Sequence, residues 1–180
     1  NGRELAGYIK ERQAKQIRGL VQAQGVEPKL AILKLKDNPV IDTYVGLKQR
    51  YGDDIGVSVE AIDIPQNEAV GKIEELNEDD SVHGIIIQLP IEDDSQTDEI
   101  LNTVAVEKDV DGLAEGSLFD PATPTAIMWL LAGYNIDLRG KKFAIIGRGR
   151  LVGIPLEKML LASGEIVEVA YRSTKDIDRL

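Results

Sequence analysis

The stretch Val82–Leu89 (VHGIIIQL) constrains the fold more than any other part of this sequence. It is an almost unbroken apolar run of strand length, which is typical of a strand buried on both faces of a parallel sheet. Four more strand-like runs alternate with helix-like stretches: Lys29–Leu35, Gly56–Ile62, Lys142–Ile146 and Ile166–Tyr171. This alternation predicts an α/β fold with mainly parallel sheets.

Between these strands, apolar residues recur at helical spacing. Helices are therefore expected over 3–24, 39–51, 66–77, 94–102, from 123 or 125 to 131, and from about 155 to 163. Asn38 and Pro39 suit the start of the second helix, as cap and first helical residue. Gly25 and Gly52 are expected to end the first and second helices.

The sequence changes character between residues 105 and 125, where glycine and proline interrupt an irregular stretch. We therefore predict two domains, 1–122 and 123–180. The second contains a strand, a glycine loop, a helix and a strand. A complete dinucleotide-binding domain needs more strands, so we expect this one to be an incomplete Rossmann-type domain at its C-terminus.

Composition excludes several classes of function. The 180 residues include no cysteine and one histidine, so thiolate and imidazole metal sites are not expected and no metal is predicted. The net charge of −10 argues against a nucleic-acid partner. No apolar run reaches membrane-spanning length, and the first residues lack the apolar core of a secretory signal. Absence of cysteine is compatible with a reducing compartment.

Tyr44 and Lys48 are four residues apart on the second predicted helix, so they share one helix face. A lysine shielded from water can lose its proton near neutral pH and transfer protons, and a neighbouring phenol can hold the amine in place. The alternative is a solvated lysine with the tyrosine packed on its stem. The spacing alone favours that alternative, because most lysines are exposed.

The loop after Lys142–Ile146 reads Gly147-Arg148-Gly149-Arg150 and continues to a third glycine, Gly153. A glycine loop between a strand and a helix places backbone amides where a pyrophosphate can bind, and the arginines add positive charge. The alternative is an ordinary tight turn. The last strand ends in Tyr171-Arg172-Ser173, and basic and hydroxyl groups there favour NADP over NAD.

Two carboxylates lie in the stretch Lys108–Gly112. Asp111 could accept hydrogen bonds from a heterocycle with amino and ring N–H groups, although such a stretch is more often a turn held by side-chain caps. Gln88, at the end of the buried strand, could face the cleft that would hold this heterocycle, or it could lie in solvent. We assign His83 no role.

Together these stretches resemble the bifunctional methylenetetrahydrofolate dehydrogenase/methenyltetrahydrofolate cyclohydrolase family. Five motifs occur in the family's order, and the likeness spans essentially the whole chain. They are Y-x-x-x-K at 44–48, G-I-I-I-Q-L-P at 84–90, K-D-V-D-G at 108–112, P-A-T-P at 121–124 and G-R-G-R-L-V-G-I-P at 147–155.

The resemblance implies an NADP-dependent enzyme that oxidises 5,10-methylenetetrahydrofolate and then hydrolyses the methenyl product to 10-formyltetrahydrofolate. It implies a three-layer α/β catalytic domain, an NADP-binding domain and a cleft between them. The family is usually homodimeric, and we expect a cytoplasmic enzyme of one-carbon metabolism that serves purine biosynthesis.

The resemblance also implies site residues. Lys48 matches the catalytic lysine, and Tyr44 matches the tyrosine that packs on the folate and assists the lysine. Gln88 matches the glutamine that contacts the lysine and the substrate, and Asp111 the aspartate that binds the pterin. Leu89 and Pro90 complete the substrate site. The NADP loop is implied to be Gly147, Arg148, Gly149, Arg150, Val152 and Gly153, with Arg172 and Ser173 at the 2′-phosphate.

Four positions depart from the family pattern: Ile41 and Gly149 stand for serines, Ala122 for a cysteine and Tyr171 for a histidine. The family's first strand, later strands, Pro-Gly-Gly-Val-Gly-Pro segment and closing helix have no counterpart.

Two alternative functions remain to be considered. Short-chain dehydrogenases also use Y-x-x-x-K, but their glycine loop precedes the tyrosine. A non-catalytic folate-binding remnant with impaired cofactor binding is the other.

Overall fold

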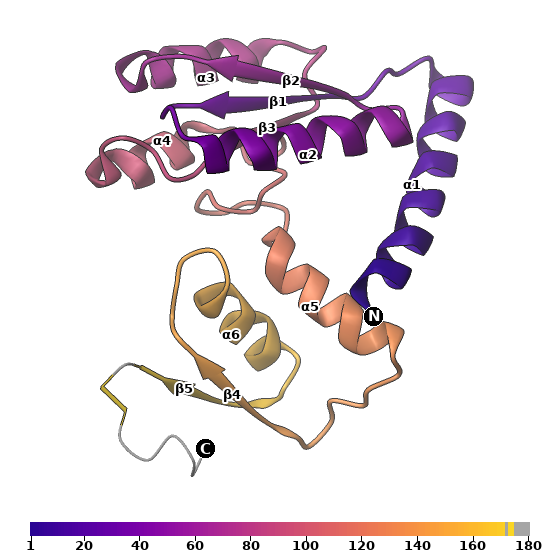
Figure 1. The fold of residues 1–180 in the computed structure, drawn as a ribbon, viewed down its shortest axis with the longest axis vertical. Coiled ribbons are helices and arrows are strands. Elements are labelled where there is room, and N and C mark those ends of the chain that lie inside the picture. The colour runs from indigo at the N-terminus through magenta and orange to yellow at the C-terminus, as the bar shows by residue number, and fades with distance from the viewer. Residues whose placement is uncertain (172, 175–180) are drawn as a thin grey trace. The chain divides into compact units, whose positions relative to one another are not determined.

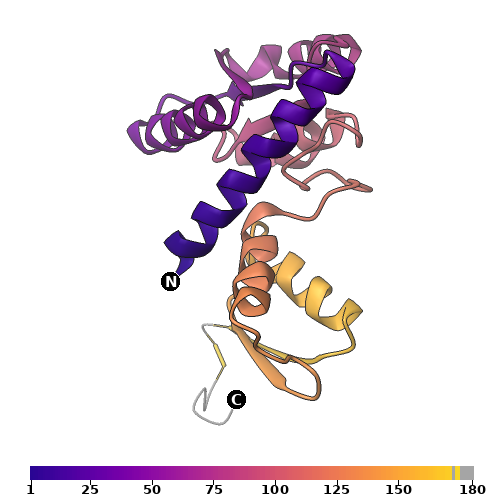
Figure 2. The same ribbon diagram turned by 90° about the vertical axis from the view of Figure 1, so that its right-hand side faces the viewer.

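The computed structural model describes residues 1–171, 173 and 174 (Figures 1 and 2). These residues form two compact units, the first Asn1–Phe119 and the second beginning at Asp120. The predicted functional boundary after residue 122 lies close to this division and stays a prediction. Each unit is described by itself.

A three-stranded parallel sheet forms the centre of the first unit. Its strands are β1 (Lys29–Lys34), β2 (Ser58–Asp63) and β3 (Gly84–Gln88), in the order β2-β1-β3. The α/β class with parallel sheets is thus confirmed. Because all three strands point the same way, their carboxyl ends meet at one edge of the sheet, the edge where open α/β sheets bind ligands.

Helices cover both faces of this sheet and make three layers (Figure 1). On one face α3 (Ala69–Glu78) and α4 (Thr97–Thr103) bury the larger apolar cluster. On the other face α2 (Pro39–Ile55) packs against β1 and β3 through a smaller cluster. Two single 3₁₀ turns, Gln66–Glu68 and Asp94–Gln96, lead into α3 and α4. The three-layer prediction is confirmed for this unit.

The long first helix, α1 (Gly2–Gln24), ends at Gly25 in the left-handed conformation (φ 67°), as predicted. It packs against α2, where Tyr51 Oη donates to Gln13 Oε1 at 2.6 Å and Lys10 forms an ion pair with Asp54. The start of α2 also follows the prediction. Asn38 Oδ1 accepts from the Val40 amide at 2.8 Å.

The prediction that Gly52 ends α2 is wrong. The helix continues to Ile55 and ends at Gly56, which is left-handed (φ 86°). Gly52 is buried where the helix meets the start of the second strand. A Cβ there would lie 2.7 Å from the Val57 carbonyl oxygen and clash with Val59 Cγ2. Gly52 is therefore needed for a close approach, whereas Gly56 supplies the cap.

The second unit contains α5 (Ala122–Gly133), β4 (Lys142–Ile146), α6 (Gly153–Ala162) and β5 (Ile166–Ala170). β4 and β5 pair in parallel and α6 connects them, which is the strand–helix–strand unit predicted from the sequence. Among the described residues, no helix is both long and apolar enough to span a bilayer.

We expect Gly52→Ala to destabilise the first unit by about 1–3 kcal/mol, because the added methyl group meets backbone and a branched side chain. Gly46→Ala is the matched control on the same helix, since a Cβ there meets only the Arg50 guanidinium at an ordinary 3.5 Å. It should be neutral or stabilising by about 0.5–1 kcal/mol. Urea unfolding would measure both, and equal destabilisation would contradict the packing role of Gly52.

Candidate active site

Lys48 lies within the buried stripe of α2. Ile41, Val45, Lys48 and Gly52 follow one another at spacings of four, three and four residues, so they share the helix face that packs on the sheet. Ile41 and Val45 are almost fully buried, and the Lys48 side chain is half-buried. A solvated surface lysine therefore does not describe Lys48.

Gln88 faces Lys48 from the end of β3. Side chains alternate along a strand, so Ile86 and Gln88 point toward α2 while Ile85 and Ile87 point to the opposite face. Lys48 Nζ donates to Gln88 Oε1 at 2.9 Å. Gln88 Nε2 donates to the Leu89 carbonyl at 3.2 Å, which fixes the amide with its oxygen toward the lysine.

The segment with the two aspartates runs beside β3. The Ile85 amide donates to the Lys108 carbonyl at 2.7 Å, and Ile85 and Asp109 form a parallel bridge. Gly84 allows this approach, because a Cβ there would lie 2.9 Å from Val110 Cγ1. A glycine inside a strand often marks such a close contact.

The two aspartates have different roles. Asp109 is almost fully buried, and its carboxylate accepts from the Gly112 and Ala114 amides at 3.1 and 2.8 Å. It holds the turn, as the alternative reading of this stretch proposed. Asp111 is partly buried instead, and its carboxylate interacts electrostatically with the Lys48 ammonium.

Burial shifts the pKa values of both charged groups, Lys48 and Asp111. It lowers the pKa of Lys48, and the opposite charge of Asp111 only partly offsets this. It raises the pKa of Asp111, with Lys48 acting in the other direction and Asp109 adding to the rise. A lysine and a carboxyl group with perturbed pKa values, close together at a strand end, are typical of a site that transfers protons.

Three further predicted residues surround this pair. Tyr44 lies one turn before Lys48 and is 57% exposed, so its ring is available to a flat ligand. Leu89 packs against the core, whereas Pro90 is exposed and follows a cis peptide bond. The spacing of Tyr44 and Lys48 had suggested that the phenol could hold the amine. In the structure Lys48 donates its hydrogen bond to the Gln88 amide oxygen instead.

The glycine loop of the second unit connects β4 to α6. Gly147 has φ 97°, and a Cβ on Gly147 or Gly149 would meet no atom within 4 Å, so the loop has an open side. Gly153 is the opposite case. A Cβ there would lie 2.8 Å from Arg148 Cα and clash with the Gly147 carbonyl oxygen. The open side, the start of a helix and two arginines fit a bound phosphate group.

Charge around this loop is partly compensated. Arg148 Nε donates to Glu157 Oε2 of α6 at 2.8 Å, and this hydrogen bond raises the pKa of the arginine further. Val152 directly precedes α6. Ser173 is exposed in a turn after β5. Arg172, the other residue predicted at the 2′-phosphate, lies outside the described residues.

The residues that support the site were not predicted from the sequence. Gly84 was not singled out, although a glycine in a run of isoleucines is a recognisable signal of close approach. The turn-holding role of Asp109 was considered without assigning it to either aspartate. The position of Lys48 in the Ile41–Gly52 stripe could also have been recognised from spacing.

Comparisons with known proteins match both units. The family described as tetrahydrofolate dehydrogenase/cyclohydrolase, catalytic domain, matches residues 1–111, and its NAD(P)-binding domain matches residues 121–180. The bifunctional protein FolD of Campylobacter jejuni serotype O:2 is 39% identical over 191 residues, covering 98% of this chain and 67% of that protein.

Two solved structures extend the similarity. The crystal structure of FolD methylenetetrahydrofolate dehydrogenase/cyclohydrolase from C. jejuni has a TM-score of 0.92 at 38% identity, covering 98% of this chain and 67% of that one. The Trypanosoma brucei enzyme, complexed with NADP and an inhibitor, has a TM-score of 0.91 at 25% identity, covering 99% and 66%. The chain spans about two thirds of these relatives.

We expect Lys48→Met to stabilise the protein by a few degrees at neutral pH. Burial lowers the pKa of Lys48 in the folded state, so the unfolded chain binds more protons there, and wild-type stability rises as the pH rises from the folded to the unfolded pKa. The advantage of the variant should therefore shrink as the pH approaches about 10, the ordinary lysine value.

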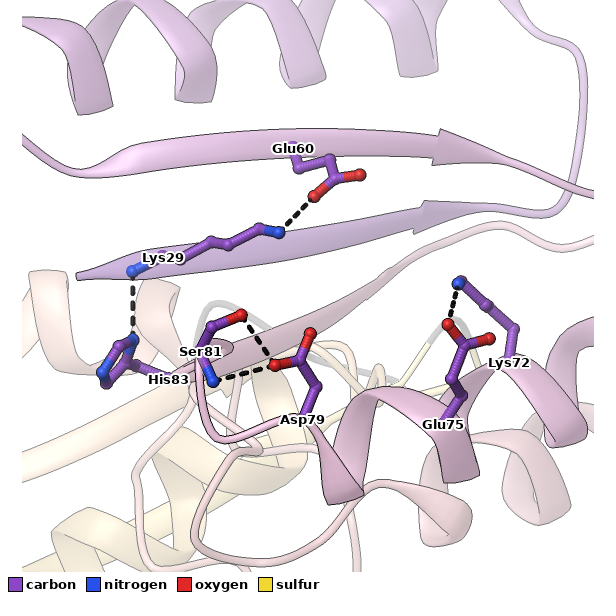
Figure 3. Close-up of polar contacts among 7 residues, drawn as sticks. All are labelled: Lys29, Glu60, Lys72, Glu75, Asp79, Ser81 and His83. Atoms are coloured by element: carbon purple, nitrogen blue, oxygen red, sulfur yellow. Dashed lines mark hydrogen bonds and ion pairs between the residues drawn. The ribbon is translucent and has the colours of Figure 1, made fainter. Parts of the chain in front are cut away.

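Thermal unfolding at several pH values measures this effect. Lys72→Met is the control, because Lys72 makes a surface ion pair with Glu75 and should give no pH-dependent gain (Figure 3). If Lys48→Met is less stable than the wild type at every pH, the Gln88 hydrogen bond outweighs the desolvation of the amine.

Proposed function

Because the chain belongs to the tetrahydrofolate dehydrogenase/cyclohydrolase family, we propose that it oxidises 5,10-methylenetetrahydrofolate with NADP and hydrolyses the methenyl product to 10-formyltetrahydrofolate. The observation that carries this proposal is the contact of Lys48 with Gln88 beside Asp111 at the carboxyl edge of the sheet. All three groups come from the first unit.

Each residue has a role in the hydrolysis. A water molecule adds to the electron-poor methenyl carbon and must lose a proton as the new C–O bond forms. Burial lowers the pKa of Lys48 and so favours the neutral amine that can take that proton, and Gln88 orients the amine. Breaking one C–N bond then requires a proton on the departing nitrogen, which the lysine ammonium can return.

Binding the folate falls to the surrounding groups. Asp111 would accept hydrogen bonds from the amino and ring N–H groups of the pterin, and its partial burial would strengthen such bonds. The exposed ring of Tyr44 can stack on the flat heterocycle. Leu89 and Pro90 would line the same site after β3. These assignments are part of the proposal.

NADP supplies the hydride acceptor for the oxidation when it is bound. In this chain the residues that would hold it are Gly147 to Arg150, Val152 and Gly153, with Arg172 and Ser173 at the 2′-phosphate. Support comes from the open side of the loop beside the start of α6. These residues would bind and orient the phosphates of NADP.

A second candidate is a folate-binding protein of this family with weakened cofactor binding. The ion pair of Arg148 with Glu157 favours it, because a phosphate must compete with a carboxylate for the guanidinium. Gly149 also offers no side-chain hydroxyl to a phosphate. Homodimer formation, cytoplasmic location and service to purine biosynthesis remain expectations that rest on the family resemblance.

Hydrolysis of methenyltetrahydrofolate, followed by its loss of absorbance, tests the main proposal. We expect the wild-type chain to exceed the buffer rate and Lys48→Met to lose at least about a hundredfold of that activity, because the proton acceptor is gone. Lys72→Met should retain it. Hydrolysis that survives in Lys48→Met would remove the lysine from the mechanism.

NADPH binding tests the second unit independently of catalysis. We expect Gly153→Ala to abolish the fluorescence change on NADPH binding, because its methyl group has no room against the loop backbone. Gly149→Ala, which adds a methyl group in open space, should bind within a few fold of the wild type. Equal affinities for all three proteins would show that the loop geometry does not decide binding.

A further inference from the structure

A second polar connection joins α2 to the sheet, at Lys34. Lys34 is the last residue of β1, and its Nζ lies 2.5 Å from Asp42 Oδ1 and 2.6 Å from Asp63 Oδ1. The lysine side chain is only 12% exposed. Asp42 lies in the first turn of α2, and Asp63 is the last residue of β2.

The register of the sheet places this connection beside the candidate active site. Lys34 pairs with Asp63 on one side and with Gln88 on the other, so the three residues form a row at the carboxyl edge. Two members of this row hold α2. Lys34 binds Asp42, and Gln88 accepts from Lys48.

These two contacts differ both in their position along the helix axis and in their direction around it. Asp42 and Lys48 are six residues apart, which is about 9 Å along the axis and about 120° around it. Lys48 lies at the edge of the buried stripe on the side of Tyr44, and Asp42 lies on the opposite flank. Two attachments at different heights and angles resist rolling of the helix, which apolar packing alone opposes less because it is non-directional.

We propose that Lys34 is a positioning residue for the folate chemistry: by holding Asp42 at the sheet edge it fixes the rotation of α2 and thereby the places of Lys48 and Tyr44. This inference rests on the proposed function. Lys34 does not transfer protons itself. Its hydrogen bonds to Asp42 and Asp63 raise its pKa, so it stays a cation paired with two carboxylates.

The same strand offers a matched control at its other end. Lys29 begins β1, and its Nζ lies 2.7 Å from Glu60 Oε2 of β2 (Figure 3). Like Lys34, it connects neighbouring strands through an ion pair, but this ion pair does not involve α2. The contact of the Lys29 amide with His83 Nδ1 involves backbone and would survive Lys29→Met.

The first experiment compares kcat and KM for methenyltetrahydrofolate hydrolysis. We expect Lys34→Met and Asp42→Asn to lower kcat by roughly ten- to a hundredfold, because a small misplacement of a catalytic group costs that much. Lys29→Met should stay within about twofold. Lys34→Arg should recover most of the activity, and Asp63→Asn should keep it, because the bond to Asp42 remains.

The second experiment measures the pKa of Lys48 by NMR titration of its ε-carbon and does not depend on activity. Asp42→Asn removes a negative charge, and direct electrostatics would lower the pKa of Lys48. A helix released from the sheet edge would hydrate the amine and raise that pKa. We expect the rise. Asp63→Asn makes the same change of charge and should not give it.

The outcomes separate the two proposals. A wild-type chain without hydrolysis contradicts the proposed function, and the titration then decides the role of Lys34 alone. A fall in kcat that is equal in Lys34→Met and Lys29→Met overturns the positioning role. So does a pKa of Lys48 that falls or stays constant in Asp42→Asn.

Discussion

The packing of α2 on the central sheet is the interaction on which the candidate site depends. Ile41 and Val45 bury their side chains against Ile32 and Ile86, and this contact sets the distance between helix and strands. A lysine in the same stripe opposes folding, since its charge loses water. Gln88 and Asp111 reduce that cost, and the remaining destabilisation is what lowers the pKa of the amine.

Elements of the fold could be predicted because their signals are local. Periodicity located the five strands of the described residues and the helices between them, and Asn38 and Gly25 marked helix ends as expected. Gly52 could not be assigned in this way. Glycine serves both as a cap and as a point of close approach, and only the contact with Val57 and Val59, which belongs to the tertiary structure, distinguishes the two uses.

The candidate site shows more clearly that local sequence signals cannot distinguish roles set by the tertiary structure. Asp109 and Asp111 are the same residue type two positions apart, so their chemistry cannot separate them. Their burial and the pairing of this segment with β3 do, because one carboxylate faces backbone amides and the other faces Lys48. Likewise Lys34 resembles any strand-end lysine until the register places it between Asp63 and Gln88. The resemblance to a family pointed to Lys48 and to its contact with Gln88, but not to the Lys34 contacts that hold α2 at the sheet edge.

The two units differ in how much a ligand would gain from their charged groups. In the first, the cation and carboxylate at the site are partly desolvated, so a ligand that replaces water there gains from a low local dielectric. In the second, the Arg148 guanidinium is already engaged by Glu157, and a phosphate gains only the difference between two anions. Backbone amides of the loop would add to the attraction for a phosphate. We therefore expect dinucleotide binding by this unit to depend on the backbone geometry at Gly153 more than on the charge of Arg148.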